Sequence, residues 1–150
     1  APIIHLSDAE LFSFERIVKT KTIMKKIIKT AQAPAPVGPY NQAIIHNDTL
    51  YASGQIALDP ATNELVTSSI EDETHRVMKN VQAILEEAGL TFGDIIKCSI
   101  FVTDISNYSR INDIYAAYFD ADTAPARELV EVAALPKGGN VEISVIAAFD

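Results

Sequence analysis

The chain of 150 residues is 48% hydrophobic and 21% charged, and it carries a formal net charge of −8. This length predicts one domain that can bury a core of its own, and no apolar run approaches the roughly 18 residues that a membrane-spanning helix requires. The negative charge repels polyanions, so nucleic-acid binding would need a local basic patch. The one candidate, the lysine-rich segment 19–29, is typical of a solvated charged segment.

The chain has a single cysteine, Cys98, which cannot form an internal disulfide. No segment is typical of a cleaved signal peptide, so we expect a cytoplasmic protein. Because Cys98 lies inside an apolar run, we expect a buried, inert thiol rather than a nucleophile.

Residues 1–23 differ from the rest of the chain and predict an N-terminal extension, helical or disordered. Ser7 to Glu10 has the spacing of a helix capping box, and apolar residues follow at helical intervals at Leu11, Phe14 and Val18. An internal start at Met24 would make the extension optional. We therefore assign the domain to residues 24–150.

The first half of the domain predicts a loop and a hairpin. Residues 32–40 contain three prolines and a glycine, which favour an irregular, stiff loop, and a short strand is expected at 25–30. The pair Asn47 and Asp48 separates two β-rich runs, so we expect strands near 42–46 and 49–57.

The second half alternates helices with strands. Apolar residues share one face of a helix from 70 to 88, and Gly89 is typical of the residue that follows a helix. The run 95–104 predicts a strand buried on both faces, followed by a helix at about 107–119. Two final strand-like runs, 126–135 and 141–149, are separated by a Pro-Lys-Gly-Gly segment that favours a turn.

This order of elements predicts an α+β fold, in which two helices cover one face of a sheet of about six strands. The other face would keep apolar residues such as Val130 and Val132, or their neighbours by alternation, in contact with water. Burial against another copy of the chain is the simplest solution. The sequence therefore predicts a homo-oligomer.

Few residues point to chemistry. The histidines His5, His46 and His75 have no metal-ligand partner at a useful spacing, so we expect no metal site. Two charged residues within strand patterns stand out, Arg127 and Glu142. They are either solvated or paired charges at strand ends, or a guanidinium that binds a small carboxylate and a partly buried carboxylate that positions water.

The spacing of these two residues limits how they can act. If the Pro-Lys-Gly-Gly segment is a tight antiparallel turn, Arg127 lies roughly 20 Å from Glu142. One chain then cannot bring both onto one small ligand. Either they serve unrelated purposes, or a site forms where Arg127 of one copy meets Glu142 of another.

Residues 24–149 resemble the RidA (YjgF/YER057c/UK114) family, also known as L-PSP endoribonucleases. Four motifs together carry the resemblance, namely APVGPYNQA (35–43), YASGQIALDP (51–60), NVQAILEEAGLTFGDIIKCSIFVTD (80–104) and PARELVEVAALPKGGNVEISVIA (125–147). The resemblance implies a trimer of chorismate mutase-like subunits with ligand clefts between neighbours.

The resemblance also implies an activity. Family members hydrolyse reactive imino and enamino acids, such as 2-aminoacrylate and 2-iminobutanoate, to 2-oxo acids and ammonia without a cofactor. Arg127 matches the arginine that holds the substrate carboxylate, and Glu142 matches the acid that orients the attacking water. The implied substrate-binding residues are Tyr40, Ser53, Gly54, Asn112 and Leu129.

The chain departs from the family pattern after the arginine, where the family has a small hydroxyl residue and often a cysteine. Here Glu128 and Leu129 occupy those positions. Alternation places Leu129 on the side of Arg127 and Glu128 on the opposite side. Leu129 can still offer backbone groups to a ligand. If Glu128 approaches its symmetry mates, the like charges repel unless they are paired or protonated.

Two other functions remain open from the sequence. One is an endoribonuclease or translation inhibitor, which the acidic balance and the lack of an aromatic and basic RNA surface disfavour. The other is a non-catalytic module that binds small carboxylates or, like a chaperone, unfolded proteins through the same clefts.

Overall fold

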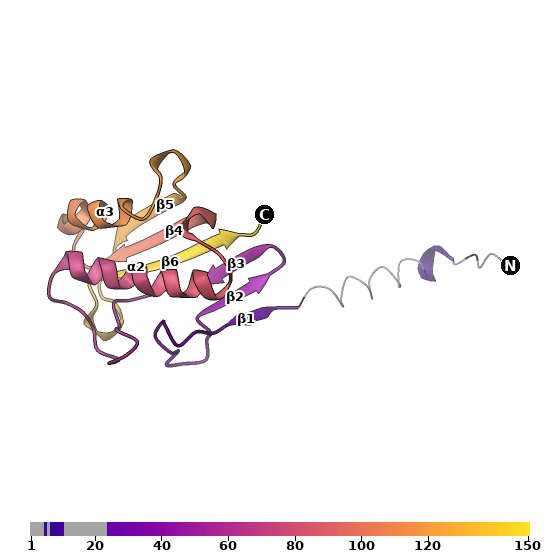
Figure 1. Ribbon diagram of the computed structural model, residues 1–150, viewed down its shortest axis with the longest axis horizontal. Helices are drawn as coiled ribbons and strands as arrows, with labels where there is room; N and C mark the ends of the chain where they lie inside the picture. The colour runs from indigo at the N-terminus through magenta and orange to yellow at the C-terminus, as the bar shows by residue number, and fades with distance from the viewer. Residues whose placement is uncertain (1–4, 6, 11–23) are drawn as a thin grey trace.

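A computed structural model describes His5, residues 7–10 and residues 24–150 (Figure 1). Six strands form one sheet, and two helices lie together against one of its faces. The elements are β1 (Lys26–Ile28), β2 (Ala43–His46), β3 (Thr49–Ala52), α2 (Ile70–Glu87), β4 (Ile95–Val102), α3 (Tyr108–Ala116), β5 (Ala126–Glu131) and β6 (Val141–Ala148). The predicted α+β class and order of elements are confirmed.

The long helix α2 begins and ends where the sequence predicts. The side chain of Ser69 accepts a hydrogen bond from the N–H of Asp72 at the first turn, and Gly89 follows the helix with φ of 76°. The buried side of α2 includes Val77, Val81 and Ile84, which pack on the sheet. Helix α3 is shorter than predicted, because the chain turns away after Ala116.

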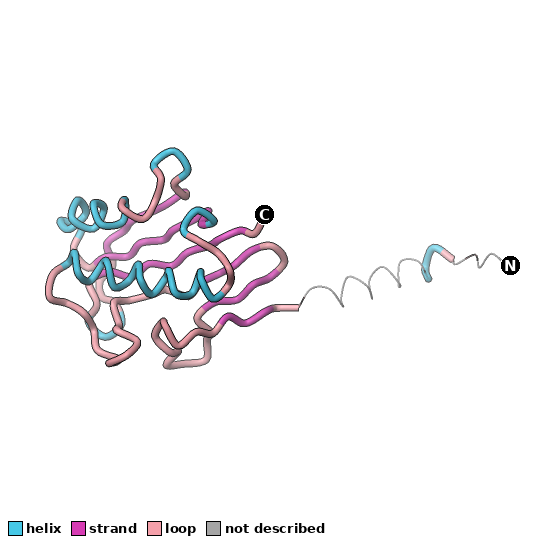
Figure 2. The backbone as a smooth tube through the Cα atoms, in the orientation of Figure 1, coloured by secondary structure: helices cyan, strands magenta, loops and turns pink. Residues whose placement is uncertain are grey.

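The strand order is β1-β2-β3-β6-β4-β5, and all pairs are antiparallel except β4 and β5. Parallel strands need a crossover connection, which α3 provides between β4 and β5. The hairpin of β2 and β3 turns at Asn47, whose φ is 54°. The long helices α2 and α3 lie on the same side of the sheet (Figure 2).

The interpretation of residues 136–139 as a tight antiparallel turn is wrong. Strand β4 separates β5 from β6, so these two strands are not paired. After β5 the chain crosses the end of β4, where the N–H of Thr103 donates to the carbonyl of Asn140. Lys137 and Gly138 both have positive φ within this crossing, at 57° and 74°. The turn residues reverse the chain as predicted, but they connect strands two positions apart.

Two strand predictions also need correction. Strand β3 ends at Ala52 instead of residue 57; Ser53 and Gly54 interrupt the ladder before Gln55 pairs with Ile143. Strand β4 is not buried on both faces of the single chain. Its buried and partly exposed residues alternate, and Ile96 at a register shift is 52% exposed.

The sheet face opposite the helices carries exposed apolar side chains, as predicted. Ile27, Tyr51 and Val130 are 52%, 45% and 42% exposed. Phe101 lies between Glu142 and Val130 across the sheet. Val132 follows the end of β5 and is half-buried. The oligomer itself stays a prediction.

The described part of the N-terminal segment contains the predicted capping box. The hydroxyl and N–H of Ser7 donate to the carboxylate of Glu10, and the N–H of Glu10 donates back to the hydroxyl. Leu11, Phe14 and Val18 lie outside the described residues. None of the helices described is long and apolar enough to span a membrane.

Candidate active site

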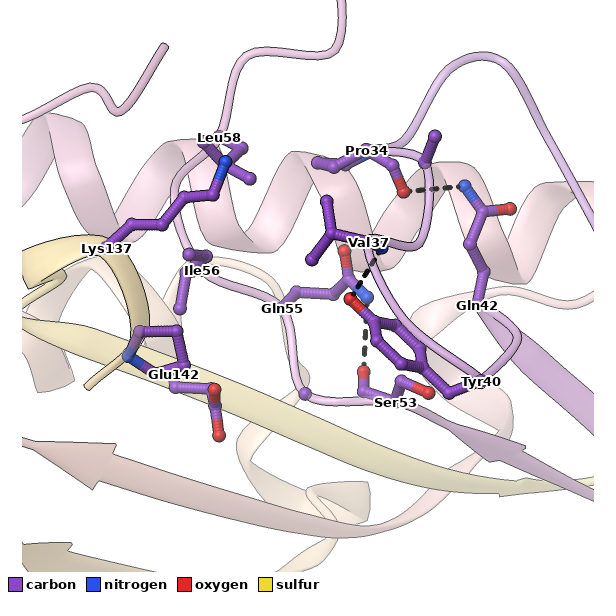
Figure 3. A pocket seen from close by; sticks show the side chains of 13 residues that line it. Pro34, Val37, Tyr40, Gln42, Ser53, Gln55, Ile56, Leu58, Lys137 and Glu142 are labelled. Carbon is purple, nitrogen blue, oxygen red and sulfur yellow. Dashed lines mark hydrogen bonds between the residues drawn. The ribbon is translucent and has the colours of Figure 1, made fainter. Parts of the chain in front are cut away.

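A pocket of about 440 Å³ lies where β3 ends and β6 begins (Figure 3). Four of the residues expected at the site line it, namely Tyr40, Ser53, Gly54 and Glu142. The other lining residues are mostly apolar and come from the loops around it: Pro34, Ala35, Val37, Gln42, Gln55, Ile56, Leu58, Pro136 and Lys137.

Glu142 supplies the carboxylate of this pocket. It projects from β6 between the fully buried Val141 and Ile143, so its own side chain lies on the face away from the helices. No donor in the described part of the chain reaches hydrogen-bonding distance of this carboxylate, and burial raises its pKa. A carboxylate of this kind can accept a hydrogen bond, and then a proton, from a bound water molecule.

Tyr40 closes one side of the pocket through the proline-rich loop. The N–H of Val37 donates to the Tyr40 hydroxyl at 3.2 Å, and the N–H of Tyr40 donates to the carbonyl of Gly38 at 2.8 Å. These contacts bend the loop so that the tyrosine ring faces the cavity (Figure 3). The ring is thus placed beside any ligand in the pocket.

Ser53 and Gly54 form the strand edge of the pocket. The Ser53 hydroxyl donates to the carbonyl of Asn41 at 2.6 Å, so its proton is used within the chain and its oxygen can only accept a hydrogen bond from a ligand. Gln42 was not predicted from the sequence; it is 3% exposed and donates to the carbonyls of Thr30, Ala33 and Pro34. This buried amide fixes the start of the loop that carries Tyr40.

Arg127 lies in a second group of residues, under α3. Its guanidinium donates to Oδ1 of Asn112 at 2.9 Å and to the hydroxyl of Tyr108 at 2.8 Å, and its centre lies 4.8 Å from the centroid of the Tyr115 ring. The sequence motifs did not predict a role for these two tyrosines. Their spacing from Asn112, at four and three residues, places all three on one face of the helix.

Leu129 and Glu128 lie on opposite faces of the sheet, in different environments. Leu129 shares the helix-covered face with Arg127 and packs against the core. Glu128, on the open face, forms an ion pair with Lys97 at 2.7 Å and accepts a hydrogen bond from the Ser99 hydroxyl at 2.8 Å. The hydrogen bond from Lys97 lowers the pKa of Glu128, so this charge has partners within its own chain.

Cys98 lies beside Arg127 in the sheet register and is fully buried. Burial raises the pKa of the thiol, which keeps it protonated and unreactive. In the described residues no group of three or more His, Cys, Asp or Glu side chains is arranged to hold a metal ion.

The pocket and the arginine group lie on opposite faces of the sheet. Arg127 reaches the helices, whereas Glu142 reaches the pocket on the other side, and β4 separates their strands. In the strand register Glu142 lies opposite Phe101, which lies opposite Val130, three residues after Arg127. Two strand spacings and three residues along the strand place the Cα atoms of Arg127 and Glu142 only about 14 Å apart. The separation of roughly 20 Å that a hairpin between β5 and β6 predicts for these residues is therefore wrong. The sheet itself keeps the two side chains apart, because they project from its opposite faces.

The chain is similar to several known proteins. A sequence model described as "Endoribonuclease L-PSP" matches residues 30–149. A 2-iminobutanoate/2-iminopropanoate deaminase from Bos taurus is 44% identical over 126 residues, which cover 84% of this chain and 91% of that protein.

Solved structures match as well. The fold superposes on a Rid-family protein from Yersinia pestis with a TM-score of 0.82 and 52% identity, covering 84% of this chain and all of the other. For E. coli TdcF with bound serine, the TM-score is 0.79 at 40% identity, with 83% and 99% of the two chains covered. The chain therefore belongs to the Rid/YjgF family, the family described as Endoribonuclease L-PSP.

Proposed function

We propose that this protein is a cofactor-independent deaminase that hydrolyses reactive 2-imino and enamino acids to 2-oxo acids and ammonia. The observation that carries the proposal is the half-buried carboxylate of Glu142, which lacks a donor in the described chain and lies in a pocket with Tyr40 and Gly54. Relatives with the same activity in their names, such as the Bos taurus protein, support it.

The site is completed, in this proposal, by a second copy in a homotrimer. Arg127 of one copy binds the substrate carboxylate, while Glu142 and the pocket belong to the neighbouring copy. The exposed apolar residues on the open face, Tyr51 and Val130, support burial of that face against a neighbour. Arg127 lies on the edge strand β5 and is only half-buried, which supports its contact with a ligand held by a neighbouring copy.

The chemistry requires only binding and proton transfer. Glu142 accepts a proton from water as the water oxygen bonds to C2 and the C=N π electrons move to nitrogen, and Glu142 then gives that proton to the nitrogen. In the resulting aminoalcohol, Glu142 transfers the hydroxyl proton to the amino group as the C–N bond breaks, which releases ammonia, forms the 2-oxo acid and leaves Glu142 ionised again. Arg127 fixes the carboxylate through its planar guanidinium, so that C2 lies at the water.

The arrangement of Arg127 suits this role. Its two hydrogen bonds to Asn112 and Tyr108 use one N–H of each terminal nitrogen, which leaves the remaining N–H groups for a carboxylate. No acidic side chain lies within salt-bridge distance of Arg127 in the part of the chain that the structure describes. A bound carboxylate would therefore supply the missing charge partner.

The test is a coupled assay in which threonine dehydratase generates 2-iminobutanoate in the presence of the protein. We expect wild type to accelerate early ammonia release, and both Arg127→Ala and Glu142→Gln to return it to the uncatalysed rate. Unchanged ammonia release with the wild-type protein, or full activity of Arg127→Ala, would overturn the proposal.

The same samples should be incubated with a defined RNA, because the family model is described as an endoribonuclease. Cleavage that survives extensive purification and disappears in Glu142→Gln would favour ribonuclease activity. Saturable binding of a small carboxylate without ammonia release would favour a non-catalytic binding protein.

A further inference from the structure

Glu73 is a buried acid in an unexpected place. It lies in the first turn of α2, where acidic residues commonly remain in water and stabilise the helix N-terminus. Here the residue is only 1% exposed. A buried carboxylate is costly unless its oxygens accept hydrogen bonds, so its partners show what the residue holds.

Within the part of the chain that the structure describes, the hydrogen bonds to the Glu73 carboxylate come from the two residues before Glu142. Oε2 accepts from the backbone N–H groups of Asn140 and Val141, at 2.7 and 3.1 Å. Oε1 accepts from the side-chain Nδ2 of Asn140 at 2.8 Å. Three donors of the described chain thus point at its two oxygens, an arrangement that needs an acceptor at both positions and does not suit an amide.

The backbone after Glu142 is also fixed. Ile143 exchanges two hydrogen bonds with Gln55, at 2.8 and 3.0 Å. Glu142 is thus held by Glu73 on one side and by Gln55 on the other, while its own carboxylate has no donor in the described chain. The direction of that carboxylate depends on the backbone beneath it.

We propose that Glu73 is a positioning residue, which fixes the start of β6 and thereby aims the Glu142 carboxylate into the pocket. The proposal rests on the proposed deaminase function for its kinetic readout. Glu73 is not among the residues that line the pocket, so it acts through the backbone and not through contact with substrate.

Two single substitutions disturb the contact between Glu73 and Asn140 with little change in volume. Glu73→Gln sets an amide NH₂ against the NH₂ of Asn140, and Asn140→Asp sets a second carboxylate against Glu73. The double variant Glu73→Gln/Asn140→Asp reverses donor and acceptor, so the introduced amide donates to the introduced carboxylate and its oxygen still accepts both backbone N–H groups. The hydrogen bond from Thr103 to Asn140 Oδ1 can also be kept.

We expect each single variant to lower kcat about tenfold or more, because small displacements of a reacting group are costly. KM should change little, since Arg127, the residue proposed to bind the substrate carboxylate, makes no contact with Glu73 or Asn140. The double variant should recover most of the lost kcat. Glu87→Gln, an exposed change of the same type on the same helix, should match wild type. Single variants with reduced melting temperature but wild-type kcat, or a double variant no better than the worse single one, would overturn the assignment.

A crystal structure of each variant separates this proposal from the proposed function. If wild type does not hydrolyse imines, the function fails, but displacement of the Glu142 carboxylate in Glu73→Gln and its return in the double variant would still establish the positioning role. An unmoved Glu142 carboxylate in both single variants would disprove it.

Discussion

The Glu142 carboxylate lies directly against the backbone of Gly54. A Cβ atom built on Gly54 would come within 2.8 Å of both Cδ and Oε2 of Glu142, which is closer than side chains pack. A glycine at this point, where β3 leaves the ladder, therefore provides the space for the carboxylate. Gly54→Ala should move Glu142 and lower kcat by up to about 100-fold, as measured by ammonia release.

The control for this change is Gly93→Ala. Gly93 lies outside the pocket, and an added Cβ would meet only the Thr91 hydroxyl oxygen, at an ordinary 3.5 Å. This variant should retain wild-type rates. Equal activity of the two alanine variants would contradict the assigned role of Gly54.

The pH dependence of the reaction should reflect the raised pKa of Glu142. Burial disfavours the ionised form, so the carboxylate is protonated at a pH where an exposed glutamate, with a pKa of 4.5, is already ionised. Because the ionised form accepts the proton from water, activity should fall as pH decreases through a midpoint above 4.5. A midpoint at or below 4.5 in kcat against pH would contradict this.

The same burial should make Glu142 unfavourable for stability. Below the unfolded-state pKa both states are protonated and the residue has no effect. As pH rises from the unfolded-state pKa to the higher folded-state pKa, the unfolded state loses its proton first, so folding becomes less favourable, and the cost is complete above the folded-state pKa. Glu142→Gln should therefore raise the melting temperature near neutral pH but not below pH 4.5, while it abolishes activity. A lower melting temperature near neutral pH would argue against this sign.

Substitutions of the arginine group should act mainly on substrate binding. Arg127→Lys keeps the charge but loses the planar pair of donors, so KM should rise about tenfold or more. Tyr108→Phe removes one hydrogen bond to Arg127 and keeps the ring, so its effect should be below about tenfold. Arg110→Ala, which breaks an exposed pair with Glu71, should leave KM unchanged.

Mixed oligomers can test whether two chains share each site. Arg127→Ala and Glu142→Gln subunits are each expected to be inactive alone. After random mixing, about a quarter of the interfaces would join an intact Arg127 to an intact Glu142, so about a quarter of the wild-type activity should return. No recovery in subunits shown by native mass spectrometry to have mixed would place both residues in one chain's site.

The open face of the sheet should control assembly. Val130→Lys introduces a charge at a 42% exposed position on this face, and it should shift the protein from trimer to monomer in light-scattering measurements. Ile105→Lys makes the same change at a 46% exposed position outside the sheet and should leave the mass unchanged. A trimer that persists in Val130→Lys would locate the interface elsewhere.

Local features of this chain could be predicted from sequence because their causes are local. The span of α2 follows from apolar residues at helical intervals, the cap at Ser69 and the glycine after its end. The turn at Asn47 follows from a residue that tolerates positive φ between two β-rich runs. The chemical character of Arg127 and Glu142 was visible for a similar reason, since charges within strand patterns are uncommon.

The pairing of strands was decided by the tertiary structure. A turn at residues 136–139 is compatible with a hairpin, but β4 can pair with both β5 and β6, and burial of its alternate residues beneath the helices favours that order. The sequence alone therefore determined the elements, the residue types of the site and an uncovered apolar face. Only long-range packing determined that Arg127 and Glu142 lie on opposite faces, and that Glu73, in the first turn of α2, is buried against the backbone beside Glu142.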